Sequence, residues 1–347
     1  MIYSQQQPVA SSNSPSDSCV TRGRTLVIQP LPGIGDMIWH LPHMHAIAST
    51  VPEGKVHILT KRRSLADRLL CADPRVGNIL WLERKPGRHD GLLGFFRLVR
   101  LLRRCCFERV WILHGSARYA WAAWLAGIPE RIGYGVDWQK YLLTTSVRLP
   151  EAHRHDHPIA KAGLLLKLMG IAQEEPEPRL AVSMEADKRV AEHFQAHPQP
   201  WIALGIGSSE PWKQWGAARF AALALALGLR KATTPLLIGG PAERELADAI
   251  LAPVRAAGGT VIDAVALPIE QTAALLARCQ LYIGNDTGVL NMAAALAVPS
   301  LGLFGGSQPL WHSRFIHAVT PPPGQQGMQA ISVEQVLAEL ARWKLDE

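Results

Sequence analysis

A carboxylate and two glycines near the N-terminus occupy a place where a parallel α/β sheet binds its ligand. The loop from Leu31 to Asp36 follows a predicted strand and precedes a predicted helix, so it belongs to the crevice beyond the carboxyl ends of the strands. Gly33 and Gly35 allow a tight turn there. Asp36 could cap the helix and interact with its dipole, or it could take a proton from a hydroxyl group as a general base. Both interpretations stay open from this loop alone.

Three loops in the second half of the chain carry groups that could hold a diphosphate. The first follows residues 201–205 and contains Ser208, Ser209 and Lys213. Its hydroxyls and backbone amides could hold phosphate oxygens, and the lysine could supply a compact positive charge for a pyrophosphate. The alternative interpretation is a polar loop anchored by a tryptophan.

The other two loops also follow predicted strands. In residues 239–243 a turn places Glu243 at a helix start, where it could accept hydrogen bonds from ribose hydroxyls or interact with the helix dipole. In residues 281–288 a strand leads into Asp286, Thr287 and Gly288, and the free amides of the helix start that follows make an anion cradle. Because all three loops come after strands, we predict that they share one crevice.

Two histidine clusters, at residues 40–45 and 153–157, are not interpreted as metal sites. In the first cluster the spacing of His40, His43 and His45 does not stack them on one helical face, and Pro42 lies among them. We therefore expect surface or acceptor-cleft histidines there and no metal ion. The second cluster is interpreted as a polar approach to a helix.

Short apolar runs alternate with helical patterns along the chain, which indicates βα units and parallel sheets. The predicted strands of the first half span residues 25–29, 55–60, 78–82 and 109–113. Those of the second half span residues 201–205, 235–238, 260–262, 281–284 and 300–304. Residues 91–106 are amphipathic with interleaved arginines; we interpret them as a packed surface helix, with a membrane-surface role as the alternative.

The chain of 347 residues is long enough for two domains of about 150 residues each. Residues 173–179 lose periodicity and gain Pro and Glu, as linkers do, so we place a boundary near residue 180. The predicted domains are residues 25–180 and 181–330. Residues 331–347 then start a helix at a capping box formed by Ser332 and Gln335.

Neither the N-terminal segment nor the apolar content suggests export or a membrane span. Residues 1–24 are rich in Ser, Gln, Pro and Asn, lack the apolar middle region of a secretory signal and are expected to be a disordered leader. No uninterrupted apolar run of about 18 residues is present. Five cysteines, at spacings that match no zinc ligand set or small disulfide framework, fit a reducing cytosol. We expect a cytoplasmic protein.

The net charge is +7 and the isoelectric point is near 9.3, with the excess of positive charge in the first half. Lys61, Arg62 and Arg63 form one cluster, and further arginines follow up to residue 104. Such clusters attract nucleic acid, phospholipid head groups and phosphorylated glycolipids alike. No recognition motif supports nucleic acid, so none is expected as a partner.

Taken together, the loops and their order resemble glycosyltransferase family 9, the ADP-heptose:lipopolysaccharide heptosyltransferases, from Thr25 to the final helix. The resemblance rests on seven stretches that occur in the family's order: residues 35–37, 126–134, 213–215, 239–243, 285–296, 298–299 and 303–305. It implies a GT-B architecture, in which two Rossmann-like domains face a central cleft and the last helix packs back on the N-terminal domain. It also implies inverting transfer without a metal or other cofactor.

The resemblance also assigns roles to individual residues. Asp36 aligns with the family's proposed general base, and Lys213 is the second residue to which we assign a catalytic role. The implied donor site comprises Ser208, Ser209 and Lys213 for the diphosphate, Glu243 for the ribose, Leu267 for the adenine, and Asp286, Thr287 and Gly288 for the sugar and phosphates. Asn291, also assigned to this site, stands where the family commonly has a histidine, and an asparagine cannot carry a positive charge.

We assign the acceptor to the basic N-terminal domain. The predicted acceptor-binding residues are Gly35, His40, Lys61, Arg62, Arg63 and Arg131. The implied reaction moves a heptose from ADP-heptose to a lipid A-linked lipopolysaccharide core, by a monomer at the inner face of the inner membrane. The alternatives are another nucleotide sugar used for surface polysaccharide synthesis, and a catalytically silent nucleotide-binding protein.

Overall fold

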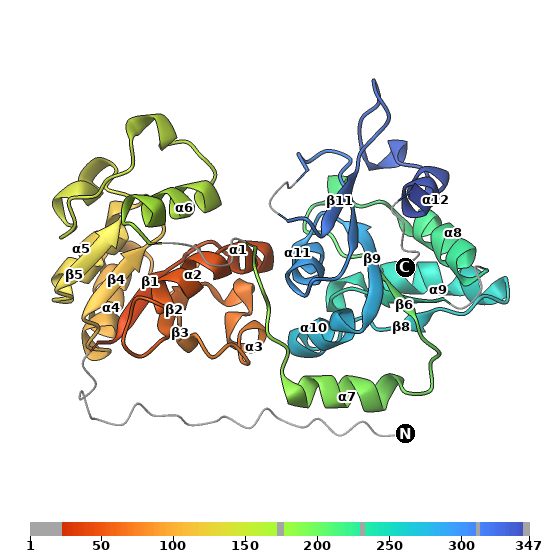
Figure 1. Cartoon of the computed structure of the whole chain (residues 1–347), viewed down its shortest axis with the longest axis horizontal. Coiled ribbons are helices and arrows are strands. Elements are labelled where there is room, and N and C mark those ends of the chain that lie inside the picture. The colour runs from red at the N-terminus through yellow and green to blue at the C-terminus, as the bar shows by residue number, and fades with distance from the viewer. Residues whose placement is uncertain (1–22, 172–176, 230–232, 310–312, 343–347) are drawn as a thin grey trace.

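Two parallel sheets carry the two halves of the chain (Figure 1). The computed structural model describes residues 23–171, 177–229, 233–309 and 313–342. Residues 1–22 of the predicted leader and most of the predicted linker at residues 173–179 lie outside the described residues. Within these ranges, no helix has the length and apolar character needed to cross a bilayer.

The N-terminal sheet has the strand order β3-β2-β1-β4-β5, with every pair parallel. Its central strand, Thr25–Ile28, is buried at every residue, as expected for a parallel strand covered on both faces. The strands are β1 (Thr25–Ile28), β2 (Val56–Thr60), β3 (Val76–Trp81), β4 (Arg109–Ile112) and β5 (Glu130–Gly133). The helices are α1 (Ile34–Trp39), α2 (Leu41–Ala48), α3 (Ala66–Leu69), α4 (Gly91–Arg104), α5 (Ala117–Leu125) and α6 (Pro158–Leu168), with the short η1 (Arg62–Ser64), η2 (Asp137–Tyr141) and η3 (Glu151–His153).

The C-terminal sheet has the order β11-β10-β9-β6-β7-β8 and is also parallel throughout. Its strands are β6 (Trp201–Gly205), β7 (Thr234–Ile238), β8 (Ile262–Asp263), β9 (Cys279–Asn285), β10 (Ser300–Leu303) and β11 (Ile316–Val319). Its helices are α7 (Met184–Phe194), α8 (Ala217–Gly228), α9 (Arg244–Ala256), α10 (Ile269–Ala277), α11 (Gly288–Ala295) and α12 (Val333–Arg342), with the short η4 (Pro211–Lys213), η5 (Pro241–Glu243) and η6 (Met328–Ala330). The predicted α/β fold with two Rossmann-like domains is confirmed.

Helix α7 is the first element of the C-terminal unit after the linker. It packs against α10, and Arg278 at the end of α10 makes two hydrogen bonds, of 2.7 and 2.9 Å, to the carboxylate of Asp187. Ser183 caps the helix by accepting a hydrogen bond from the Ala186 amide.

The last helix lies where it was not predicted. We expected it to pack back on the N-terminal domain, but α12 packs against α8 of the C-terminal domain (Figure 1). Val336 and Leu340 are buried in that domain's core, and Trp215 Nε1 donates to the Ile331 carbonyl oxygen at 2.8 Å just before the helix. The Gln335 amide N–H donates to Ser332 Oγ, which is half of the predicted capping box.

The two strands that the sequence analysis missed, β5 and β11, lie at sheet edges. Each is only partly buried and contains a charged or titratable residue, so neither has the continuous apolar run of an inner strand. Arg109 Nε and Glu130 Oε2 form a 2.6 Å ion pair on the aligned first residues of β4 and β5.

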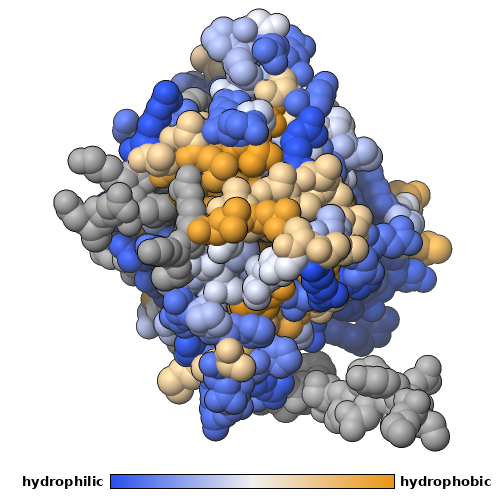
Figure 2. All heavy atoms as spheres, turned by 90° about the vertical axis from the view of Figure 1, so that its right-hand side faces the viewer, coloured by the Kyte–Doolittle hydropathy of each residue, from blue (hydrophilic) through white to orange (hydrophobic). Residues whose placement is uncertain are grey.

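Figure 2 faces the end of the C-terminal domain, where apolar residues form a band between hydrophilic regions. Cys71, Cys105 and Cys279 are free thiols.

Candidate active site

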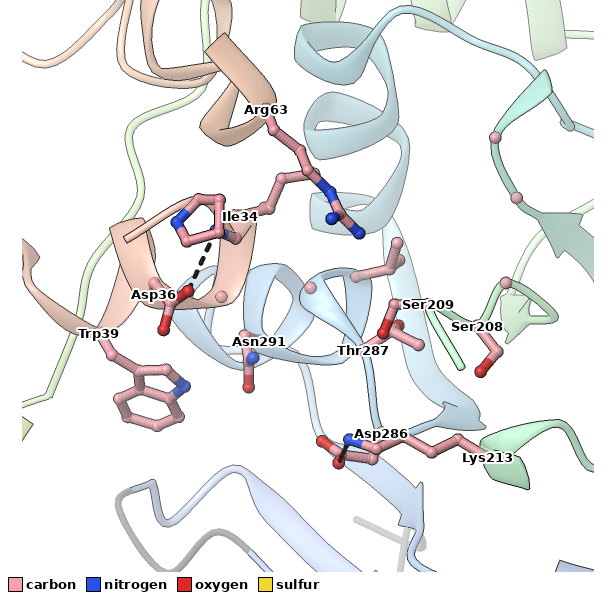
Figure 3. Close-up of a pocket in the computed structure, with 18 of the residues that line it drawn as sticks. Ile34, Asp36, Trp39, Arg63, Ser208, Ser209, Lys213, Asp286, Thr287 and Asn291 are labelled. Atoms are coloured by element: carbon pink, nitrogen blue, oxygen red, sulfur yellow. Dashed lines mark hydrogen bonds and ion pairs between the residues drawn. The ribbon is translucent and has the colours of Figure 1, made fainter. Parts of the chain in front are cut away.

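A cleft of about 600 Å³ lies between the carboxyl ends of the two sheets (Figure 3). The N-terminal domain contributes the loop and first helix after β1, together with Arg63, His157 and Ile159. The C-terminal domain contributes the three loops that follow β6, β7 and β9. The structure thus brings the three predicted anion-binding loops and the Asp36 loop to one cavity.

The position of Asp36 is compatible with both roles that its loop suggested. As the third residue of α1, it accepts a hydrogen bond from the Gly33 amide at 3.0 Å through Oδ2, and so caps the helix. The same side chain lines the cleft and is only partly buried (Figure 3). Capping occupies one carboxylate oxygen, and a carboxylate has lone pairs to spare for a proton.

The side chain of His40 is hydrogen-bonded to the backbone of the same helix. Its Nδ1 lies 2.7 Å from the Asp36 carbonyl oxygen. Because a carbonyl can only accept, Nδ1 carries the proton of a neutral imidazole. Burial lowers the pKa of His40, which keeps the ring neutral. The predicted acceptor contact is therefore wrong: the ring is wholly buried and does not line the cleft.

The other histidines of this cluster are also interior residues, against the expectation of a surface position. Burial, with a smaller effect of nearby His40, lowers the pKa of His43 to about 3. His45 Nε2 lies 2.6 Å from Asp73 Oδ2 in a buried pair. Helix α2 is buried at every residue, which the proline and three histidines in its sequence concealed. Among the described residues, no group of three or more His, Cys, Asp and Glu side chains is arranged to hold a metal ion.

The two domains touch through glycines on either side of the cleft. Helices α1 and α11 pack together, and a Cβ on Gly35 would lie 2.4 Å from Asn291 Nδ2. A Cβ on Gly288 would lie 2.9 Å from Ile34 Cβ. Gly35 and Gly288, predicted as acceptor and donor contacts, therefore also set how closely the two helices approach.

Asn291 lies at the centre of this contact and lines the cleft between Asp36 and Thr287 (Figure 3). It is buried, and its Oδ1 accepts no hydrogen bond from the described residues. A buried polar atom without a partner carries a desolvation cost of about 1–3 kcal/mol. A ligand hydroxyl in the cleft would remove that cost.

Lys213 is held over the cleft by an acidic partner. Its Nζ donates to Asp286 Oδ2 at 2.6 Å (Figure 3). The Ser307 hydroxyl donates to the same oxygen at 2.8 Å. The ammonium also lies 5.2 Å from the centre of the Trp212 ring. Lys213 and Asp286 come from the loops after β6 and β9, so this pair joins two of the three predicted loops.

The start of α11 presents donors to the cavity. Thr287 is its N-cap in extended conformation, and the Thr287 hydroxyl does not cap the helix. The first amides of a helix have no partner within it, and they carry the positive end of its dipole. Below this turn Tyr282 is fully buried, and burial raises the pKa of its hydroxyl, with a smaller opposing effect of the Thr287 side chain.

The serines and the glutamate shape their own loops as well as lining the cleft. The Ser208 hydroxyl donates to the Glu210 carbonyl oxygen at 2.7 Å, while Ser209 is exposed beside it. Glu243 Oε2 accepts from the Gly240 amide at 2.7 Å, which is the predicted interaction with a helix start. Its carboxylate borders the cavity opposite Gly207.

Sequence reasoning assigned no role to Asn285, whose hydrogen bonds connect the loops after β6 and β9. Asn285 is fully buried at the end of β9, and its amide donates to the carbonyl oxygens of Ile206 and Gly207 at 3.1 and 3.0 Å and to Gln214 Oε1 at 3.1 Å. Its Oδ1 accepts from the Trp215 amide. An asparagine that ends a buried strand was the available signal, because a buried amide needs several partners.

Of the predicted basic acceptor residues 61–63, only Arg63 lines the cleft. The Arg62 guanidinium pairs with Glu83 at 3.3 Å and lies over the Trp81 ring. Lys61 does not line the cleft; it lies near His114, whose pKa its charge helps to lower, after the larger effect of burial.

Two further assignments are not supported by the positions of the side chains. Arg131 does not line the cleft: its guanidinium donates to the carbonyl oxygens of Leu142, Ile128 and Pro129 and holds the turn around β5. Leu267, predicted beside the adenine, packs against the hydrophobic core and does not line the cavity. Trp39, which sequence reasoning did not select, does line it.

Comparison with known proteins identifies the family. The model of glycosyltransferase family 9 (heptosyltransferase) matches residues 95–323, more than half of the chain. Lipopolysaccharide heptosyltransferase 2 of Escherichia coli (strain K12) is 27% identical over 306 residues, which cover 82% of this chain and 84% of that protein.

Solved structures of the family share the fold. The glycosyltransferase family 9 protein of Veillonella parvula gives a TM-score of 0.78 at 22% identity, over 94% of this chain and 98% of its own. The Escherichia coli ADP-heptose lipopolysaccharide heptosyltransferase II gives 0.72 at 23% identity, over 92% and 98%. The chain therefore belongs to glycosyltransferase family 9, the heptosyltransferases, and is a glycosyltransferase.

Proposed function

We propose that this chain transfers a heptose from ADP-heptose to a lipid A-linked lipopolysaccharide core, with inversion at the anomeric carbon. One observation carries the proposal: the Asp36 carboxylate of the N-terminal domain and the Lys213 ammonium of the C-terminal domain line one cavity. The names of the relatives, which specify lipopolysaccharide and ADP-heptose, support the choice of substrates.

In the proposed reaction Asp36 accepts the proton of an acceptor hydroxyl as that oxygen attacks the anomeric carbon. The new carbon–oxygen bond forms on the face opposite the nucleotide, and the bond to the diphosphate breaks. Negative charge then grows on the departing ADP. Lys213 and the amides at Thr287 and Gly288 are held in advance where that charge develops, which is electrostatic stabilisation by fixed groups.

Asp286 acts in this proposal by positioning Lys213. The ion pair holds the ammonium in place before the donor binds, with Ser307 sharing the carboxylate. Asn291 contributes its unpaired Oδ1, which would accept a hydrogen bond from a hydroxyl of the donor sugar. A sugar hydroxyl suits this position because the amide oxygen has no other donor among the described residues.

The acceptor is proposed to carry phosphates. Arg63 faces the cavity from the N-terminal domain. Close by, the charges of Lys161, Lys61 and Arg84 all help to lower the pKa of His114, so these cations lie together at the carboxyl edge of the sheet. A phosphorylated glycolipid at the inner face of the inner membrane would match this charge.

The decisive experiment is the measurement of ADP release from ADP-heptose with a set of truncated lipopolysaccharide acceptors. The proposal predicts release that depends on one class of truncated acceptor. A parallel thermal shift series with ADP, UDP and GDP identifies the nucleotide, because a ligand bound only by the folded state raises the melting temperature. Stabilisation by ADP without release on any acceptor would instead indicate a catalytically silent nucleotide-binding protein.

A further inference from the structure

The N-terminal domain exposes a cluster of large apolar side chains. At the start of α4, Leu92, Leu93 and Phe96 are 79, 76 and 59% exposed. Contiguous exposed apolar surface on a folded protein marks an interaction site more often than an isolated exposed leucine does. The cluster extends to Trp121 and Trp124 of α5, and to Trp138 and Tyr141 of η2. We call these seven residues the α4–α5–η2 face.

Packing brings the three elements of this face together. Helix α4 packs against α5, and α5 packs against η2. Arg118 near the start of α5 donates to the carbonyl oxygens of His89 and Gly91, which ties the beginnings of the two helices together. In Figure 1 both helices lie at the end of the N-terminal domain remote from the C-terminal domain.

The face is aromatic in a way that the rest of the described surface is not. The Trp121 and Trp124 rings lie 5.6 Å apart, and the Trp138 and Tyr141 rings 5.7 Å apart. In the described part of the C-terminal domain, Trp212, beside the cleft, is the one large aromatic side chain that is exposed. Tryptophan and tyrosine gather at the boundary between lipid tails and water, because their rings are apolar with a polar group at one end.

The positive charge of residues 84–104 favours an anionic lipid surface over a second copy of the chain. Residues 84–104 contain seven arginines and lysines and a single acid, Asp90. Along the exposed side of α4, apolar Leu92 and Phe96 are followed by Arg100 and Arg103. A second copy of the chain would bring these cations against their equals across a two-fold axis. An anionic bilayer would accept the apolar tip and neutralise the arginines together.

The position of the face relative to the cleft is consistent with a lipid-linked acceptor. Helix α4 follows β3 and η2 follows β5, so both leave the carboxyl edge of the N-terminal sheet. The Asp36 loop leaves the same edge after β1. A membrane that touches Leu92 and Trp138 therefore lies on the edge of the domain that carries the proposed base.

We propose that the α4–α5–η2 face docks the enzyme on an anionic lipid bilayer, with Leu92, Leu93 and Phe96 entering the interfacial region and the α4 arginines contacting lipid phosphates. Two of these arginines also donate to carbonyl oxygens of the chain: Arg103 donates to Leu125 at the end of α5, and Arg97 donates to Arg88 at 3.3 Å. The inference extends the proposed function, but it does not depend on which nucleotide sugar is the donor.

The test is co-sedimentation of the full chain with vesicles of phosphatidylethanolamine and phosphatidylglycerol. Leu92→Ser combined with Leu93→Ser and Phe96→Ser should lower the partition coefficient by about a hundredfold, because three apolar side chains no longer enter the lipid. The matched control is Met184→Ser with Leu229→Ser, which removes two side chains that are 89 and 86% exposed elsewhere. The control should bind as the wild type does.

A charge variant provides the second arm. Arg97→Gln with Arg100→Gln should lower binding by about thirtyfold, since each basic residue near an anionic surface strengthens binding by a factor of about five. Binding of the wild type should fall with salt and be weak on phosphatidylcholine vesicles. Equal binding by the wild type and the triple serine variant would overturn the proposal.

Two further readouts separate the possible failures. Transfer to a water-soluble acceptor without acyl chains should be unchanged in the serine variant, which shows that the variant is folded. Light scattering tests whether a second copy of the chain covers the face instead. If the wild type is a dimer and the serine variant is a monomer, the face is a dimer interface and the proposal of lipid docking is overturned. Vesicle binding without transfer to any acceptor would instead refute the proposed function and leave docking intact.

Discussion

Replacing Asp36 by asparagine separates the two tasks of this carboxylate. Its Oδ2 accepts the Gly33 N–H at 3.0 Å, and an asparagine carbonyl oxygen can keep that bond. The variant loses a negative charge in the first turn of α1, worth about 0.3–1 kcal/mol, and it loses the ability to take up a proton. We expect Asp36→Asn to retain nearly all of its free energy of unfolding, while kcat falls about a hundred- to ten-thousandfold.

Asp36→Ala is the matched comparison. It removes the base and also the cap, so a further loss of about 0.5–2 kcal/mol in the free energy of unfolding is expected. Both variants should lose kcat to a similar extent, because the same proton acceptor is missing. Urea unfolding measures the stability, ADP release at saturating donor and acceptor measures kcat, and calorimetric titration with ADP measures donor binding.

The comparison can fail in two informative ways. If Asp36→Asn keeps kcat within about threefold of the wild type, Asp36 is a helix cap and not the base, since loss of general-base catalysis costs far more. If Asp36→Asn instead loses as much stability and ADP binding as Asp36→Ala, the fall in kcat reports a displaced helix. In that case the carboxylate's role is structural.

Three other changes test the site and its surroundings. Gly35→Ala should destabilise the fold by about 1–3 kcal/mol in urea unfolding, because the new Cβ would lie 2.4 Å from Asn291 Nδ2; adding Asn291→Ala should recover part of that loss, and no recovery would contradict the proposed clash. Lys213→Met should lower kcat about a hundred- to thousandfold and weaken ADP binding in calorimetry; unchanged values would remove Lys213 from the diphosphate site. The pKa of His43 is lowered to about 3, so the unfolded state binds the proton more tightly and stability should fall as pH drops from about 6.5 toward 3, by up to about 1.4 kcal/mol per pH unit. His43→Gln should flatten this slope in urea unfolding at several pH values, whereas an equal slope would assign it to other groups.

The inner strands and the cleft loops could be predicted because local chemistry determines both. Residues 201–205 form β6 as predicted, since a parallel strand covered on both faces needs a continuous apolar run. The loops after β6, β7 and β9 could be assigned to one crevice because the carboxyl ends of parallel strands share an edge. Edge strands such as β5 lack the apolar run and were missed.

The errors concern tertiary packing, which the sequence does not state locally. Arg131 has the charge of an acceptor contact, but its guanidinium is bound by three carbonyl oxygens that only the folded turn brings together. His40 looks polar and available, but it lies under α1 with its Nδ1 hydrogen committed to the Asp36 carbonyl. The apolar side of α12 predicts that the helix is buried, but it does not indicate against which domain. In the structure α12 is buried against the core around Trp215.

The contact between α1 and α11 determines how the two halves of the chemistry meet. Gly35 directly precedes the proposed base, and Gly288 directly follows Thr287 at the proposed phosphate cradle. Because each glycine leaves no room for a Cβ, the two helices approach closely at the residues adjacent to the reacting groups. We therefore expect a movement of one domain against the other to change the distance between Asp36 and the start of α11 less than it changes other distances across the cleft. The proposed base and the proposed diphosphate site thus meet where the backbones of α1 and α11 are in close contact.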